Sequence, residues 1–218
     1  ASRIQTKVRP PVKRPPISLD RFILLKGLLA GVSFTLLAFA YGQISNYIAL
    51  YAKEMGLAIS SGLFFTVYAV GLIVSRLFAG KRVDKGKVTQ TIALGLGITV
   101  VALLGLGLCH HCNALGTDYT AVAFLLIALC CGLGFGAAFP SFNALFINLG
   151  THAQRGTATS TYLTTWDLGL GIGIFSGGML AEHFSFATAY LVASASVQVS
   201  LVFFISVVAP HYQRNKLC

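Results

Sequence analysis

The sequence predicts an all-α membrane protein with six transmembrane helices, chiefly because its charged residues are few and unevenly distributed. Hydrophobic residues occupy 56% of the 218 positions and charged residues only 10%, whereas soluble domains carry about 25% charged residues. So few charges cannot cover a soluble surface, which excludes a soluble globular domain and a disordered chain. Five stretches contain no Asp, Glu, Lys or Arg, namely residues 27–52, 55–75, 88–117, 119–154 and 183–213.

These charge-free stretches locate the membrane spans. A helix needs about 20 mainly apolar residues to cross a bilayer. The stretch 156–181, in which Asp167 is the single charge, is also long enough. Because the apolar residues do not alternate with a period of two, helices are favoured over barrel strands. We expect spans near residues 22–50, 57–79, 89–109, 119–148, 157–181 and 187–209.

The predicted spans divide the chain into three regions. Residues 1–20 hold four of the six prolines and five of the 16 basic residues, which is typical of an extended, basic cytoplasmic linker. Residues 21–209 form the six-helix transmembrane bundle, and residues 210–218 form a cytoplasmic tail. The linker indicates a connection to something upstream, so we expect the chain to be part of a longer protein.

The basic residues also predict the orientation. Every Lys and Arg except Lys53 falls on one side of the predicted topology. Cytoplasmic loops carry the excess of Lys and Arg, so both termini should be cytoplasmic. The net charge of +10 is therefore an orientation signal, and the lipid bilayer rather than a nucleic acid is the expected partner.

The first span carries polar and aromatic side chains in its outer half. Gln43 and Tyr47, and likewise Gln43 and Asn46, have helical spacings that place them on one face. Amide and phenol groups beside aromatic rings suit an amphiphilic ligand, although the same groups could make hydrogen bonds between helices. The full set of substrate-cavity candidates is Tyr41, Gln43, Asn46, Tyr47, Tyr68, Asn143 and Trp166.

Glycines recur every four residues in two of the later spans. Gly132 and Gly136 share a face of the fourth span, and Gly169, Gly173 and Gly177 share a face of the fifth. Small residues at this spacing let neighbouring helices approach closely in membranes. Both stripes therefore predict tight helix packing.

Asp167 is the one carboxylate well inside a predicted span. It lies 12 residues past Arg155, which is about 18 Å along a helix and close to the middle of the membrane. Charged groups at that depth are costly and usually mark transport pathways or proton relays. Asp167 is thus a proton-coupling candidate, and the alternative is a structural Asp bonded to Thr or Tyr neighbours.

A short Cys-His cluster, Cys109-His110-His111-Cys112, stands at the outer end of the third span. Cysteine and histidine at this spacing can bind zinc, but a site needs four ligands and no second cluster is present. We favour a chance cluster at the membrane edge, with a disulfide as a further option, and expect no metal and no cofactor. The sequence shows no catalytic triad, paired carboxylates or phosphate loop, so an enzyme is not expected.

The segment after the second span is rich in glycine and basic residues. Its residues Gly80, Asp84, Lys85, Gly86 and Lys87 match the pattern Gly-x-x-x-Asp-(Arg/Lys)-x-Gly-(Arg/Lys), except that the residue between the base and the second Gly is missing. Through this motif the chain resembles the major facilitator superfamily. The alternative is a plain basic loop that obeys the positive-inside rule.

Two further features resemble the drug-efflux members of that superfamily. The pair Arg155-Gly156 opens the fifth span, and an Asp-x-Gly-x-Gly-x-Gly run begins at Asp167. The resemblance covers nearly all of residues 20–209 and fits the C-terminal half best. It implies six helices built as two inverted three-helix repeats. The first, second, fourth and fifth of these would line a cavity, and the third and sixth would face lipid.

The resemblance also implies a function and a partner. We expect secondary active transport of a small solute by alternating access, with proton-coupled efflux as one option, together with the N-terminal six-helix half of the same transporter. The expected location is the bacterial inner membrane. The gating residues would be Arg76, Gly80, Asp84, Lys85, Gly86, Lys87 and Arg155. The rival hypothesis is a six-span membrane scaffold, or a redox or metal-binding membrane protein, without transport activity.

Overall fold

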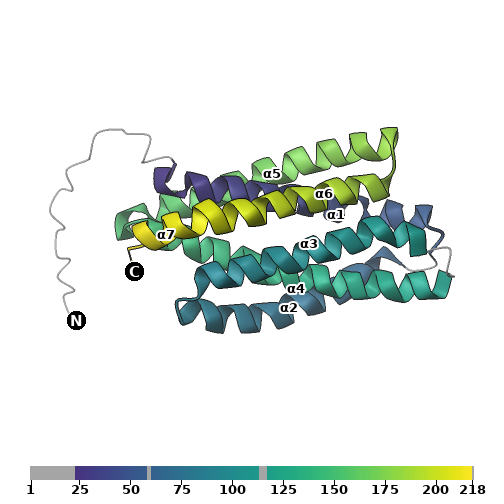
Figure 1. Cartoon of the computed structure of the whole chain (residues 1–218), viewed down its shortest axis with the longest axis horizontal. Helices are drawn as coiled ribbons and strands as arrows, with labels where there is room; N and C mark the ends of the chain where they lie inside the picture. Colours follow the sequence, from purple (N-terminus) through teal and green to yellow (C-terminus); the bar gives the residue numbers. More distant parts are fainter. Residues whose placement is uncertain (1–22, 58–59, 113–116, 218) are drawn as a thin grey trace, which may run out of the picture.

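A computed structural model describes residues 23–57, 60–112 and 117–217, and their regular secondary structure is entirely helical (Figure 1). The long helices are α1 (Leu28–Glu54), α2 (Ser61–Asp84), α3 (Val88–Cys112), α4 (Thr117–Leu149), α5 (Arg155–His183) and α6 (Phe186–Phe203). A 3-10 turn, Leu25–Gly27, precedes α1, and another, His152–Gln154, precedes α5. A π-helical turn, Phe204–Val208, joins α6 to the short helix α7 (Ala209–Asn215), so that α6 and α7 lie end to end.

Five of the described helical stretches are long and apolar enough to cross a membrane: Leu25–Glu54, Gly62–Asp84, Val88–His110, Tyr119–Leu149 and Phe186–Asn215. The chain is therefore an integral membrane protein, as predicted. Helix α5 is long enough to cross a membrane but is less hydrophobic than these five stretches, because it contains many glycines, threonines and serines as well as Asp167. The membrane crossing by α5 stays a prediction.

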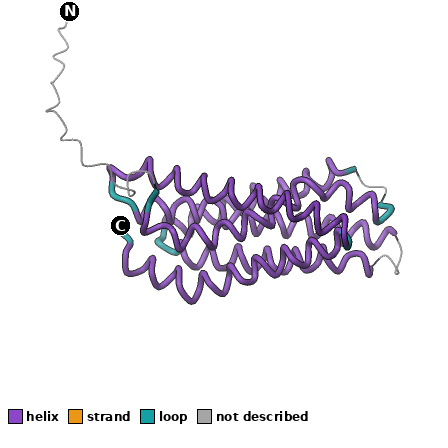
Figure 2. The backbone as a smooth tube through the Cα atoms, turned by 90° about the horizontal axis from the view of Figure 1, so that it is seen from above, coloured by secondary structure: helices purple, strands orange, loops and turns teal. Residues whose placement is uncertain are grey.

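The helices run side by side along one direction, and the described connections gather at the two ends of the bundle (Figure 2). The start of α1 and the end of α7 lie at the same end (Figure 1), where His211 Nε2 is 3.1 Å from the carbonyl oxygen of Lys26. The C-terminal segment also folds back onto α4, because the Leu217 amide donates a hydrogen bond of 3.0 Å to the carbonyl of Asn148.

Helix ends follow local chemistry. The Ser60 hydroxyl caps α2 by accepting from the Leu63 amide at 3.3 Å, and the Ser185 hydroxyl caps α6 in the same way through Thr188 at 3.1 Å. Helix α2 runs on to Asp84, so only Lys85, Gly86 and Lys87 separate it from α3. Gly86 makes this reversal with φ of +74°, a conformation that glycine adopts without strain.

The basic segment after the second span is therefore more helical than a simple loop. Arg76 and Gly80 lie within α2 rather than in the connection. Lys81 and Arg82 occupy its last turn, where cations interact favourably with the helix dipole. Because Lys and Arg are also good helix formers, the helix continues past the end of the predicted span.

Close pairs of helices organise the bundle. Helix α1 packs along α5 and α2 along α4, while α3 packs on α4 and α6, and α6 on α1. The glycine stripes make the two pairs close. A Cβ atom on Gly173 would collide with the backbone of Phe39 in α1, and one on Gly132 would collide with the carbonyl of Tyr68 in α2. Both predictions of tight packing at glycine stripes are confirmed.

Candidate functional site

A row of aromatic side chains bridges the space between the α1–α5 pair and the α2–α4 pair. The ring of Trp166 on α5 lies 4.9 Å from that of Tyr41 on α1 and 4.6 Å from that of Phe139 on α4, measured between centroids. Tyr41 in turn lies 5.5 Å from Phe135. Helices α1 and α4, and α4 and α5, touch only over short stretches, so these side chains supply much of the contact between the pairs. We call Tyr41, Phe135, Phe139, Tyr162 and Trp166 the aromatic row.

The aromatic row rests on a buried base and is itself only partly covered. Phe34 is fully buried beneath it and stacks on Tyr162, with centroids 4.6 Å apart and an interplanar angle of 20°. Tyr41, Phe139, Tyr162 and Trp166 are half-buried. Their rings therefore offer apolar faces to whatever lies against this side of the bundle.

Several buried polar groups have no hydrogen-bond partner among the described residues. These are the Tyr68 hydroxyl, the Asn143 carbonyl oxygen, both amide atoms of Gln43 and the Tyr190 hydroxyl. Buried polar groups normally find partners, and those without one often bind water or a ligand. Tyr68 lies 6.3 Å from Phe135, and Asn143 follows Phe139 by one helical turn. Two unpaired polar groups therefore adjoin the aromatic row.

Three candidates on α1 are placed differently from one another. Gln43 is fully buried at the α1–α5 contact, where a Cβ atom on Gly177 would meet its side chain. The Tyr47 hydroxyl donates to the carbonyl of Ile174 at 2.7 Å, the interhelical hydrogen bond that the alternative interpretation expects. Asn46 is exposed and bonds to its own helix through the carbonyl of Gly42 at 3.0 Å.

Asp167 lies on the exposed face of α5. Its carboxylate makes no hydrogen bond or ion pair with any described residue, and the side chain is exposed. Ser160, Thr164 and Gly171 share this exposed face at helical spacings of three and four. Trp166, its neighbour in sequence, turns instead toward the aromatic row. Asp167 is therefore free to meet a group outside the described bundle.

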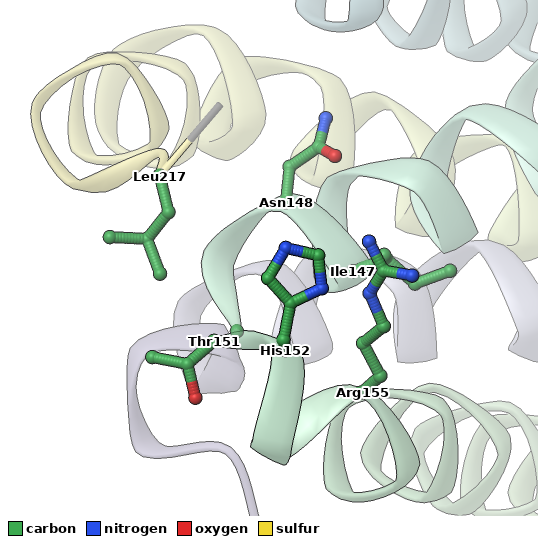
Figure 3. A pocket seen from close by; sticks show the side chains of 7 residues that line it. Ile147, Asn148, Thr151, His152, Arg155 and Leu217 are labelled. Carbon is green, nitrogen blue, oxygen red and sulfur yellow. The ribbon is translucent and has the colours of Figure 1, made fainter.

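The predicted gating residues gather near one end of the bundle but do not all meet. Asp84 is the last residue of α2, is exposed, and forms no ion pair with a described residue. Arg155 begins α5 and lines a cavity of about 230 Å³ together with His152, Asn148 and Leu217 (Figure 3). Figure 3 shows the His152 ring and the Arg155 guanidinium side by side, with Leu217 across the cavity.

The Cys-His cluster can be placed only in part. Cys109 is buried at the end of α3, whereas the side chains of His111 and Cys112 lie outside the described residues. Among the residues that are described, no three His, Cys, Asp or Glu side chains gather as metal ligands would. Cys131 is buried inside the bundle, as expected of a small apolar residue.

Sequence reasoning missed part of the aromatic row. Phe135, Phe139 and Tyr162 of the row and Phe34 beneath it were not among the candidates, although Phe34, Phe135 and Phe139 each contact Tyr41 or Trp166. The spacing of Phe135 and Phe139 was a usable signal, since residues four apart share a helix face. Tyr162 and Trp166 repeat the same spacing on α5.

The fold and site define a polytopic helical membrane protein with an aromatic, partly polar face. A sequence profile of the Major Facilitator Superfamily matches residues 3–174, and the chain belongs to this superfamily. It is similar to the multidrug resistance protein MdtG of Salmonella paratyphi A, with 25% identity over 163 residues, 72% of this chain and 38% of the relative. MdtG of Salmonella arizonae is 24% identical over the same shares. The chain thus spans about 38% of the length of these relatives.

Proposed function

We propose that the chain is the C-terminal six-helix half of a secondary active transporter of the bacterial inner membrane. In this proposal it exports a small amphiphilic solute by alternating access, and Asp167 couples export to proton entry. The observation that carries the proposal is the exposed, unpaired carboxylate of Asp167 on α5. The family membership and the similarity to multidrug resistance proteins support it.

The exposed face of α5 is the first step of the argument. A carboxylate near the bilayer centre costs about 2.5–3.5 kcal/mol or more against lipid. Thr164 and Ser160 share the face with Asp167, so this face is poorly suited to lipid over about two turns. A water-filled cavity or another set of helices must cover it. The other six-helix half is the natural cover, because relatives extend well beyond the matched region.

The packing pattern supports two inverted three-helix repeats. In two such repeats α1 is equivalent to α4, α2 to α5 and α3 to α6. When equivalent helices are exchanged, the α1–α5 pair becomes the α4–α2 pair. The same exchange turns the α3–α4 contact into the α6–α1 contact and leaves the α3–α6 contact unchanged, and all of these contacts exist. Such a repeat requires six crossings, with α5 equivalent to the membrane-spanning α2.

The aromatic row supports an amphiphilic substrate. Half-exposed rings of Tyr41, Phe139 and Trp166 offer apolar area, and the unpaired groups of Tyr68 and Asn143 offer hydrogen bonds nearby. Ligand sites commonly combine apolar walls with a few polar groups in this way. Asp167 follows Trp166 in the sequence of α5, so its protonation can act on substrate binding through this helix, although its own side chain lies on the exposed face.

The residues predicted to form a gate gather near one end of the bundle, as a gate on one side of the membrane requires. With both termini cytoplasmic, Asp84, Lys85, Gly86, Lys87 and Arg155 lie at the inner end of the bundle. We propose that the Asp84 carboxylate meets a helix N-terminus of the other half and holds the inner side closed. Such a contact is worth about 0.3–1 kcal/mol, or up to about 2 kcal/mol when partly buried.

The test is uphill transport by the full-length protein in vesicles with an imposed proton gradient. Asp167→Asn keeps the shape of the side chain and mimics its protonated form. We expect this variant to be expressed normally and to bind substrate, but to lose gradient-driven accumulation. Glu182→Gln is the matched control, because Glu182 is an exposed carboxylate in the last turn of α5. This variant should keep transport. Intact coupled transport in well-expressed Asp167→Asn protein would remove Asp167 from the mechanism.

A further inference from the structure

Two adjoining hollows lie on the outer side of α3, away from the aromatic row. The first, of about 180 Å³, is lined by Phe78 and Arg82 of α2 and by residues of α3 and α4. The second, of about 430 Å³, continues along α3 past Gly97 to Val101. Leu94 and Ile98 line both hollows. We propose that they form one groove that binds an anionic glycerophospholipid, with the acyl chains against α3 and the phosphate at Arg82.

The lining is apolar except at one end. Ser75 and Thr91 line the first hollow, but their hydroxyls already donate to the carbonyls of Leu133 and Lys87 at 2.7 and 2.8 Å. The guanidinium of Arg82 makes no hydrogen bond or ion pair with a described residue. One unpaired cation at the mouth of an apolar groove matches an amphiphile with an anionic head. The same cation would repel an amphiphile with a cationic head.

The position and length of the groove fit one leaflet of a bilayer. Arg82 lies in the last turn of α2, at the end of the bundle where the membrane surface is expected. Along α3, the groove runs from Thr91 to Val101, which is about 15 Å at 1.5 Å per residue. Half of a hydrocarbon core of about 30 Å has the same depth. An acyl chain anchored at Arg82 can therefore follow the groove to the middle of the membrane.

The hollow at Gly97 exists because the residue has no side chain. A Cβ atom placed there would meet no atom of a neighbouring helix within 4 Å, so a larger side chain would extend into the groove. Lys81 offers a matched comparison for Arg82, because it is an exposed cation in the same helical turn that does not line either hollow. These two positions separate a specific lipid site from general attraction of the basic surface. The inference does not depend on transport activity.

The experiment is native mass spectrometry of the purified full-length protein with phosphatidylglycerol or phosphatidylcholine of identical acyl chains. We expect the wild type to retain phosphatidylglycerol preferentially. Arg82→Gln should lower this preference about five-fold, the effect of one cation near an anionic surface, while Arg82→Lys and Lys81→Gln should keep it within about two-fold. Gly97→Leu should reduce retention of both lipids, whereas Gly97→Ala, which adds a single methyl group to the same open position, should reduce it much less.

Three results overturn the proposal. The first is the absence of a preference for phosphatidylglycerol in the wild type. The second is an equal loss of preference in Lys81→Gln and Arg82→Gln, which means general surface attraction. The third is unchanged lipid retention in Gly97→Leu, which places the lipid elsewhere. If Arg82→Gln fails to fold, Arg82→Lys and Gly97→Leu still decide between a groove site and none.

Discussion

The outward faces of α3 and α5 are both exposed on this bundle, yet their chemistry differs. On α3 every exposed residue between Gln90 and His110 is apolar, as at Leu94, Ile98 and Val101. On α5 the exposed face between Thr159 and Gly171 is mostly small or polar and carries Asp167. Exposure alone therefore does not say what covers a helix. The face of α3 suits lipid, whereas that of α5, on our proposal that α5 crosses the membrane, requires water or protein.

An added carboxylate should show the largest difference between the exposed faces of α3 and α5. Val101→Asp places a carboxylate on the lipid-suited face of α3, at a position that is 69% exposed. It should cost about 3 kcal/mol of membrane insertion and sharply lower the amount of folded protein in membranes. Gly171→Asp places the same group on α5 and should be tolerated, apart from repulsion of about 0.5 kcal/mol from Asp167 one turn away. Equal losses in both variants would show that the two faces meet the same surroundings.

Two glycines of α5 sharpen the contrast between its buried and exposed sides. Gly173→Ala forces a methyl group onto the backbone of Phe39, and such overpacking costs about 1–3 kcal/mol. We expect a thermal unfolding midpoint several degrees lower. Gly171→Ala meets open space and should keep or raise the midpoint, since Ala favours helix by about 1 kcal/mol over Gly. A midpoint for Gly173→Ala equal to that of Gly171→Ala would contradict the close α1–α5 contact.

The smallest expected effect concerns one hydrogen bond between α1 and α5. Tyr47→Phe removes the hydroxyl that donates to the carbonyl of Ile174, and such bonds in membrane proteins contribute about 0.6 kcal/mol on average. Its thermal midpoint should fall slightly, by an amount measurable against Tyr119→Phe, whose ring is 75% exposed and which should leave stability unchanged. A stability loss in Tyr119→Phe as large as that in Tyr47→Phe would show that the bond is not the cause.

Features that depend on one helix were predictable from the sequence. The glycine stripes at spacing four and the reversal at Gly86 follow from local chemistry, because they concern only what a backbone can approach or adopt. The helical ranges followed from the absence of charges. The extension of α2 beyond residue 79 to Asp84 was missed because positive charge suggested a loop, although Lys and Arg also stabilise the last turn of a helix.

Features that depend on the rotation of one helix against another were not predictable. Gln43 and Tyr47 share a face by their spacing, yet Gln43 is buried without a partner and Tyr47 bonds to α5. Which aromatic side chains meet depends likewise on four helices at once, so only Tyr41 and Trp166 of the aromatic row were anticipated. No pattern within a single span encodes that arrangement.

The most direct test of the difference between α3 and α5 is water accessibility in the membrane. The five native cysteines are replaced by Ala in the full-length protein, and a single cysteine is placed at Thr164 or at Val101. Thiolates form only in contact with water, so a water-soluble maleimide reports the surroundings of each side chain. We predict rapid labelling at position 164 and almost none at position 101. Failure of both positions to react, with the protein folded, would contradict a water-accessible pathway along α5.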